Sequence, residues 1–124
     1  MNSQQIGKTL VDLCNQGKNL DAIESLYSKD VVSVEATGGP EMPRESKGID
    51  DVRAKNRWWY DNHEVHGGKA EGPFPHEDRF AVKFAYDVTA KNGPMKGQRF
   101  QMNEVGLYTV KNGKIVREEF FYEM

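Results

Sequence analysis

The chain has 124 residues, a length that suits one domain with a real hydrophobic core. Its formal net charge of −2 argues against nucleic acid or an anionic membrane surface as a partner, because both bind a concentrated basic face. The single cysteine excludes an internal disulfide and is compatible with a reducing cytoplasm, and no apolar run reaches membrane-spanning length. We therefore expect one cytoplasmic domain over residues 1–124.

Helical periodicity dominates the first part of the chain. Apolar residues at helical spacing predict a helix that ends near Gly17 and a second helix that begins near Asn19. Cys14 lies on the apolar stripe of the first helix, so we interpret it as packing and not as a nucleophile. An apolar strand over residues 31–36 follows, and the segment 37–43 is rich in Gly and Pro, which predicts a loop.

A third helix is predicted from about Ile49 to Asp61. Its inward stripe contains Asn56 and Trp59, whereas Trp58 falls on another side. From His63 onward the apolar period changes to two, which indicates strands with one buried face. The expected strands cover residues 63–71, 79–89, 98–110 and 115–122, the last two joined by the hairpin signal Asn112–Gly113. This order predicts an α+β domain in which three helices cover one face of a curved, mostly antiparallel sheet.

Four strings in this order resemble the SnoaL-like group of the NTF2-like superfamily, which includes ketosteroid isomerases. They are NQGKNLD at 15–21, LYSKDVV at 26–32, KGIDDV at 47–52 and VKNGKIV at 110–116. The resemblance implies a single SnoaL-like domain with a cystatin-like, cone-shaped α+β barrel, three N-terminal helices and a pocket on the concave face of the sheet. It also implies a homodimer through the outer sheet face. Relatives include isomerases, polyketide cyclases and epoxide hydrolases, so the fold alone does not define an activity.

Glu35 is the principal candidate for chemistry. It ends an apolar strand, where a carboxyl group costs free energy unless it is paired, hydrated or functional; a solvated strand end is the alternative. Relative to Tyr27 it stands where ketosteroid-isomerase-like relatives carry their general-base Asp, so the resemblance implies that role. Leu10, however, occupies the position of their oxyanion-binding Tyr, and their second donor, whose place falls near Val105 or Gly106, has no clear counterpart. Steroid isomerisation by that mechanism is therefore disfavoured.

Two further residues are candidate acids. Glu104 alternates with Met102 and Tyr108 on one strand face, which would make it a second carboxyl in the pocket; a bulge that turns it outward is the alternative. His63, just beyond the third helix, would reach the pocket mouth, with a surface or dimer contact as the alternative. Because His63 and His66 would point to opposite faces of a strand, we expect no metal site, and no cofactor is expected either.

Aromatic and amide side chains are the candidate substrate-binding groups. Trp59 is the best aromatic wall, with Tyr27 and Tyr86 behind it. Asn56 shares the inward helical stripe, and a polar amide on a buried face requires a partner. The charged run Arg117–Glu119 near the carboxyl end is expected on a solvated face or in a dimer contact.

These observations predict a protein that binds a compact, partly apolar small molecule. If it is an enzyme, the expected step is proton abstraction next to a carbonyl, which would make it a cofactor-independent isomerase or cyclase. Glu35 would be the base, Glu104 or His63 the partner acid, and Trp59 and Asn56 would hold the substrate. The competing hypothesis is a non-catalytic ligand-binding or dimeric accessory module, which Leu10 favours. A hydrolase that activates water between carboxyl groups is a third option.

Overall fold

The computed structural model describes residues 1–39 and 42–123 and contains three helices and six strands within these ranges. The α+β class and the order of the predicted elements are confirmed. The predicted loop 37–43 includes residues 40–41, which lie outside the described part of the chain. The helices are α1 (Ser3–Asn15), α2 (Asn19–Leu26) and α3 (Ile49–Asn62). The strands are β1 (Tyr27–Val34), β2 (Glu45–Lys47), β3 (His63–His76), β4 (Arg79–Ala90), β5 (Arg99–Lys111) and β6 (Lys114–Phe121).

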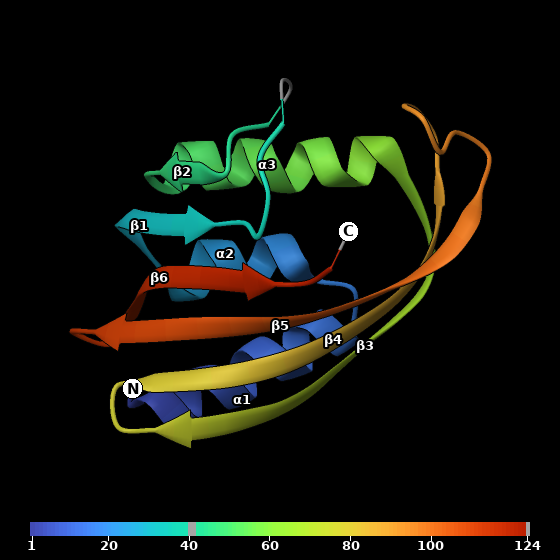
Figure 1. Ribbon diagram of the computed structural model, residues 1–124. Helices are drawn as coiled ribbons and strands as arrows, with labels where there is room; N and C mark the ends of the chain where they lie inside the picture. The colour runs from blue at the N-terminus through green and yellow to red at the C-terminus, as the bar shows by residue number, and fades with distance from the viewer. Residues whose placement is uncertain (40–41, 124) are drawn as a thin grey trace.

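The strands form one sheet in the order β2-β1-β6-β5-β4-β3. Four of the five pairings are antiparallel, and β1 runs parallel to β6. The long strands β3 to β5 bend at one end toward the end of α3, as Figure 1 shows. The sheet is curved but open, with β2 and β3 as its edges. It therefore does not close into the barrel that the resemblance implied.

The helices cover one face of this sheet. Alternation along β4 explains how: Phe80, Val82 and Phe84 are buried, whereas Arg79 and Lys83 are exposed. The buried face joins residues of all three helices in one core, whose largest fully buried members include Ile6, Leu10, Val52, Phe80 and Tyr108. The opposite face of the sheet is exposed and still carries large apolar side chains, among them Val105 and Phe121.

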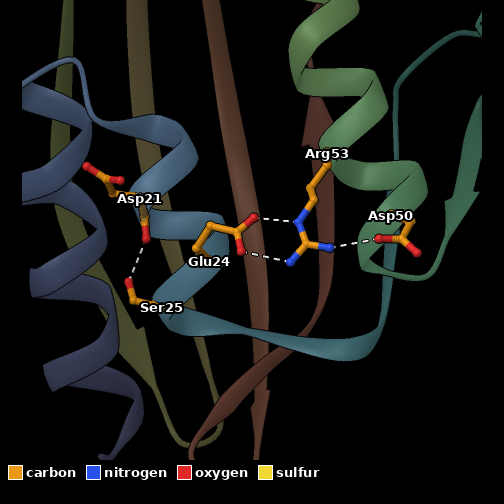
Figure 2. Close-up of polar contacts among 5 residues, drawn as sticks. All are labelled: Asp21, Glu24, Ser25, Asp50 and Arg53. Atoms are coloured by element: carbon orange, nitrogen blue, oxygen red, sulfur yellow. Dashed lines mark hydrogen bonds and ion pairs between the residues drawn. The ribbon is translucent and has the colours of Figure 1, made fainter.

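An ion cluster on the outside ties α2 to α3, and we call it the α2–α3 clamp. Figure 2 shows the guanidinium of Arg53 between Glu24 on α2 and Asp50 in the first turn of α3. Arg53 binds both carboxylate oxygens of Glu24, and Nη1 donates to Asp50 Oδ1 at 2.7 Å. The planar fork of the guanidinium suits this bidentate contact. The clamp links two helices whose other faces contribute to the cavity described below.

Most boundaries differ from the prediction by one or two residues, and three larger differences each have a physical reason. β1 begins at Tyr27 and not at residue 31. Its pairing with β6 shifts register between Tyr27 and Val32, and residues 28–30 between them are polar. The apolar pattern of a strand is therefore recognisable only from residue 31 onward. β2 was not predicted, since it has only three residues, two of them exposed. β3 continues to His76 and not to residue 71, because an edge strand tolerates the prolines of its last part.

Candidate functional site

A cavity of about 140 Å³ lies between the helices and the concave face of the sheet. Aromatic rings form much of its wall: of the nineteen described residues that line it, eight are Trp, Tyr or Phe. The same set contains three carboxyl groups, those of Glu35, Glu104 and Glu118, and one ammonium, that of Lys55. An aromatic enclosure with a few convergent polar groups is the usual architecture of a small-molecule site.

The three carboxyl groups come from neighbouring strands of the sheet. Glu35 follows β1, Glu104 lies on β5 and Glu118 on β6, and these strands are adjacent. Val105, the neighbour of Glu104, is 41% exposed on the outer face, so the alternation of β5 directs Glu104 into the cavity. The pairing of β4 with β5 has no register shift, so the bulge that would have turned Glu104 outward is absent from this pair.

Glu118 corrects the expectation that residues 117–119 form a solvated run. Only 3% of Glu118 is exposed, and it accepts a hydrogen bond of 2.6 Å from the Tyr27 hydroxyl. Its neighbours Arg117 and Glu119 lie on the outer face and pair with each other at 2.9 Å. A register shift between Thr109 and Val110 interrupts the simple alternation of this hairpin. The inward direction of Glu118 is therefore hidden in the sequence.

Lys55 is a second cavity residue that was not predicted as part of the site. Its ammonium donates to Ser33 Oγ, lies 3.4 Å from Glu35 Oε1, and sits 5.1 Å from the centroid of the Phe120 ring. Lys55 itself is buried, with its side chain 11% exposed. A signal was present: Lys55 lies three residues after Val52 and four before Trp59, the spacing of the inward stripe of α3. Lysines are rarely buried unless they are paired, so this signal carried little weight.

The environment of Glu104 gives it unusual acid–base behaviour. Burial and the nearby charge of Glu35 raise its pKa to about 7, and the charge of Lys55 partly opposes this rise. Burial likewise raises the pKa of Glu118, with Lys55 and the Tyr27 hydrogen bond acting in the opposite direction. Glu35 Oε2 is buried without a hydrogen-bond partner among the described residues. An unpaired buried acceptor in a cavity is a position where a ligand can supply the missing donor.

The predicted substrate-binding residues Tyr27, Asn56, Trp59 and Tyr86 all line this cavity. Trp59 packs against Tyr86, with ring centroids 5.4 Å apart. Trp58 lines the cavity as well, although the helical stripe had placed it on another side. The aromatic wall is therefore broader than a single helical stripe predicts.

His63 is not brought to the carboxyl groups. Its ring stacks on Trp59 at 4.8 Å, and its Nδ1 lies 2.8 Å from the Trp59 carbonyl oxygen. It is absent from the side chains that line the cavity within residues 1–39 and 42–123. Cys14 does line the cavity, but burial raises the pKa of its thiol to about 12, which agrees with its interpretation as packing and not as a nucleophile.

Within the described ranges, no group of three or more His, Cys, Asp or Glu side chains is arranged to hold a metal ion. Among the same residues, no helix combines the length and the apolar character that crossing a membrane requires.

Comparisons with solved structures first define the class of protein. An NTF2-like protein from Burkholderia pseudomallei superposes with a TM-score of 0.78 at 18% identity, over 99% of this chain and 92% of that chain. A protein with a ketosteroid isomerase-like fold from Catenulispora acidiphila, solved in complex with trimethylamine, superposes with a TM-score of 0.74 at 15% identity, over 99% and 88% of the two chains. At these identities the likeness concerns the fold alone, which is NTF2-like.

The chain belongs to the SnoaL-like domain family, whose model matches residues 1–122. A protein from Mesorhizobium loti, described as a candidate SnoaL-like polyketide cyclase and also as a carbohydrate phosphatase, is 47% identical and superposes with a TM-score of 0.90. That alignment covers 98% of this chain and 100% of the other. A search of functionally curated proteins finds no match. The family predicted from the four sequence strings is therefore confirmed.

Proposed function

We propose that this chain is a cofactor-independent enzyme that moves a proton next to the carbonyl group of a compact, partly apolar substrate, as an isomerase or cyclase does. One observation carries the proposal: a single cavity contains Glu35 Oε2, which has no hydrogen-bond partner within residues 1–39 and 42–123, and the Glu104 carboxyl group, whose pKa is raised to about 7. Two carboxyl groups in unlike environments can serve as base and acid in the same reaction. The likeness to the Mesorhizobium loti protein, assigned as a candidate polyketide cyclase, supports the same reaction class.

In this mechanism Glu35 takes a proton from the carbon next to the substrate carbonyl. The carbon–hydrogen bond breaks, a hydrogen–oxygen bond forms on Glu35, and the electron pair moves into a carbon–carbon double bond as negative charge develops on the oxygen. Glu104 is partly protonated near neutral pH; as the partner acid it gives its proton to the charged oxygen and takes it back when the carbonyl group re-forms. Glu35 then returns its proton to a carbon of the substrate, and the ionised base is restored.

The walls of the cavity support a small substrate. Trp59 and Tyr86 offer adjacent aromatic surfaces, and Asn56 offers an amide that can hydrogen-bond a polar group. The volume of about 140 Å³ is close to that of an engineered apolar cavity of about 150 Å³ that holds benzene. We therefore expect a substrate with one ring or a short chain, since a fused multi-ring compound would extend out of the cavity.

Proton exchange tests this proposal without knowledge of the product. A panel of compact ketones is incubated with the protein in deuterium oxide, and replacement of the hydrogens next to the carbonyl is followed by NMR. At least one ketone should exchange faster with the wild type, Glu35→Gln should abolish the gain, and Glu104→Gln should reduce it by about 10²- to 10⁴-fold. Glu64→Gln, an exposed position on β3, is the matched control. Unchanged exchange in Glu35→Gln would remove that residue as the base.

A non-catalytic binding module is the second candidate, and Leu10 favours it. Leucine lines the cavity at the position that corresponds to the oxyanion-binding Tyr of the isomerases, and it cannot donate a hydrogen bond. Native mass spectrometry of the purified protein tests for a retained ligand. If that ligand binds wild type and Glu35→Gln equally and no compound in the panel exchanges, the binding module is the better description.

We also propose a homodimer through the outer face of the sheet. Val105 on β5 and Phe121 on β6 face each other in the pairing register, and both are exposed there. Apolar side chains at neighbouring positions on an exposed sheet suit a contact between copies. Light scattering on wild type and Val105→Glu distinguishes the states, with a dimer expected for the former and a monomer for the latter. A wild-type monomer would contradict this arrangement.

A further inference from the structure

Lys55 is the only Lys, Arg or His among the described residues that line the cavity. Three contacts hold its ammonium there: the hydrogen bond to Ser33, the ion pair of 3.4 Å with Glu35 Oε1, and the Phe120 ring. The group is thus fixed beside the carboxylate that the proposed function assigns as the base. An ammonium has three N–H bonds, and among the described residues Ser33 and Glu35 accept two of them, which leaves one N–H for a ligand.

We propose that Lys55 binds the carbonyl oxygen of the substrate and stabilises the negative charge that develops on it; this inference rests on the proposed function. The reacting carbon and the oxygen of a carbonyl compound would then contact two adjacent side chains. The carbon–hydrogen bond would lie against Glu35 Oε2, the buried oxygen that lacks a partner in the described part of the chain, and the carbonyl oxygen would accept the remaining N–H of Lys55. Lys55 thereby supplies the donor that Leu10 cannot supply from α1.

Charge balance is the main reason for this assignment. Before the reaction the ammonium of Lys55 faces the ionised carboxylate of Glu35. When Glu35 accepts the proton it becomes neutral, and the same negative charge appears on the substrate oxygen. Lys55 exchanges one anionic partner for another, and the total charge of the cavity is unchanged. A fixed cation beside a developing oxyanion acts strongly in a site from which water is excluded.

The position of Lys55 on α3 places its ammonium beside the aromatic wall. Lys55 and Trp59 are four residues apart, so they share one face of the helix, and the ligand that stacks on Trp59 lies next to the ammonium. The α2–α3 clamp holds this helix from its outer side. A group on a held helix keeps its position better than one on a loop.

The test uses a variant that reproduces the charge state after proton abstraction. Glu35→Gln places a neutral side chain beside Lys55 and should leave the ammonium ready for an anionic oxygen. The probe is 4-nitrophenol, a compact phenol whose phenolate absorbs visible light. The neutral matched compound is 4-nitroanisole. The double variant Glu35→Gln/Lys55→Met removes both members of the ion pair, so neither charge is left unpaired in the fold.

Glu35→Gln should bind 4-nitrophenol as its phenolate, seen as a phenolate absorbance band at a pH where the free compound is largely protonated. The double variant should lose this band and weaken binding by at least about tenfold, the effect of one lost hydrogen bond to a charged group. Binding of 4-nitroanisole should be the same in both variants, which also verifies that the cavity is intact.

Three results would overturn the role of Lys55: no phenolate binding by Glu35→Gln, equal phenolate binding by the double variant, or an equal loss for both compounds. The proposed function fails separately. If Glu35→Gln exchanges ketone hydrogens like the wild type while phenolate binding still depends on Lys55, the base assignment is wrong and the oxyanion site remains.

Discussion

Replacing Glu104 with Gln should make the protein more stable than the wild type at alkaline pH and leave its stability unchanged in acid. Burial and the charge of Glu35 raise the pKa of Glu104 from 4.5 to about 7. The folded state therefore holds this proton more tightly than the unfolded state. It follows that the free energy of unfolding of the wild type falls as the pH rises from the unfolded value through the folded one. Glutamine resembles the protonated carboxyl group and does not ionise.

The size of the effect follows from the same pair of values. The interval from 4.5 to about 7, at about 1.4 kcal/mol for each pH unit, corresponds to roughly 3 kcal/mol. This penalty is absent below about pH 4.5, where Glu104 is protonated in both states, and is complete above about pH 8. Most of the change should fall between these limits, with the steepest part near the middle.

Urea denaturation followed by circular dichroism measures the difference between the two proteins at about pH 4.5, 6, 7 and 8. The midpoint of Glu104→Gln should match that of the wild type at the lowest pH and exceed it progressively above. Glu64→Gln, which alters an exposed carboxyl on β3, should follow the wild type throughout. A difference between Glu104→Gln and wild type that stays constant with pH would refute the reasoning, because the two proteins would then bind protons equally.

The remaining predictions concern the neighbours of Glu104 and the clamp. Glu35→Gln should lower the pKa of Glu104, because the substitution removes a negative charge that raises this pKa. Carbon-detected NMR of the Glu104 carboxyl group measures the pKa. An unchanged titration curve would show that the two groups do not interact. Tyr27→Phe should cost about 1–3 kcal/mol, because Glu118 loses a buried donor. The loss should be larger at alkaline than at acidic pH, since an ionised carboxylate depends more on that donor, and an equal loss in urea titrations at both would contradict this. Arg53→Met should lower the midpoint of urea unfolding, because it removes the ion pairs of the clamp. The difference in midpoint between wild type and variant should shrink in about 1 M salt, where the Debye length is about 3 Å. A difference that does not depend on salt would indicate that Arg53 acts through packing.

The parts of the site that could be predicted are those governed by alternation and helical spacing. Glu104 enters the cavity because β5 keeps its period of two, so that its neighbour Val105 faces outward. Asn56 and Trp59 share the cavity because helical spacing places them on the inward face of α3. Glu35 is more than a strand-end residue only because the fold places β1 beside β6. The position of Glu35 in the pocket was inferred from the resemblance and not from the residues themselves.

The missed residues depend on contacts between distant parts of the chain. Lys55 is buried because Ser33 and Glu35, about twenty positions earlier, supply its partners. A lysine in a helix otherwise indicates a solvated position, so the one local signal, the place of Lys55 on the inward stripe of α3, carried little weight. Glu118 is buried because a register shift in the last hairpin alters the alternation, and its donor Tyr27 lies on another strand. Local periodicity cannot reveal a buried polar group whose partner comes from elsewhere in the fold.

The same contacts explain why these groups point to a function. A cavity that encloses three carboxyl groups and one ammonium is costly, because each charge loses its hydration. Apolar residues would fill this space at a lower cost, and the stability expected for Glu104→Gln above neutral pH measures part of that difference. A carboxyl group that lowers stability near neutral pH has no structural reason to be there. Acid–base chemistry on a bound molecule does provide one, since a catalytic acid must titrate close to the working pH.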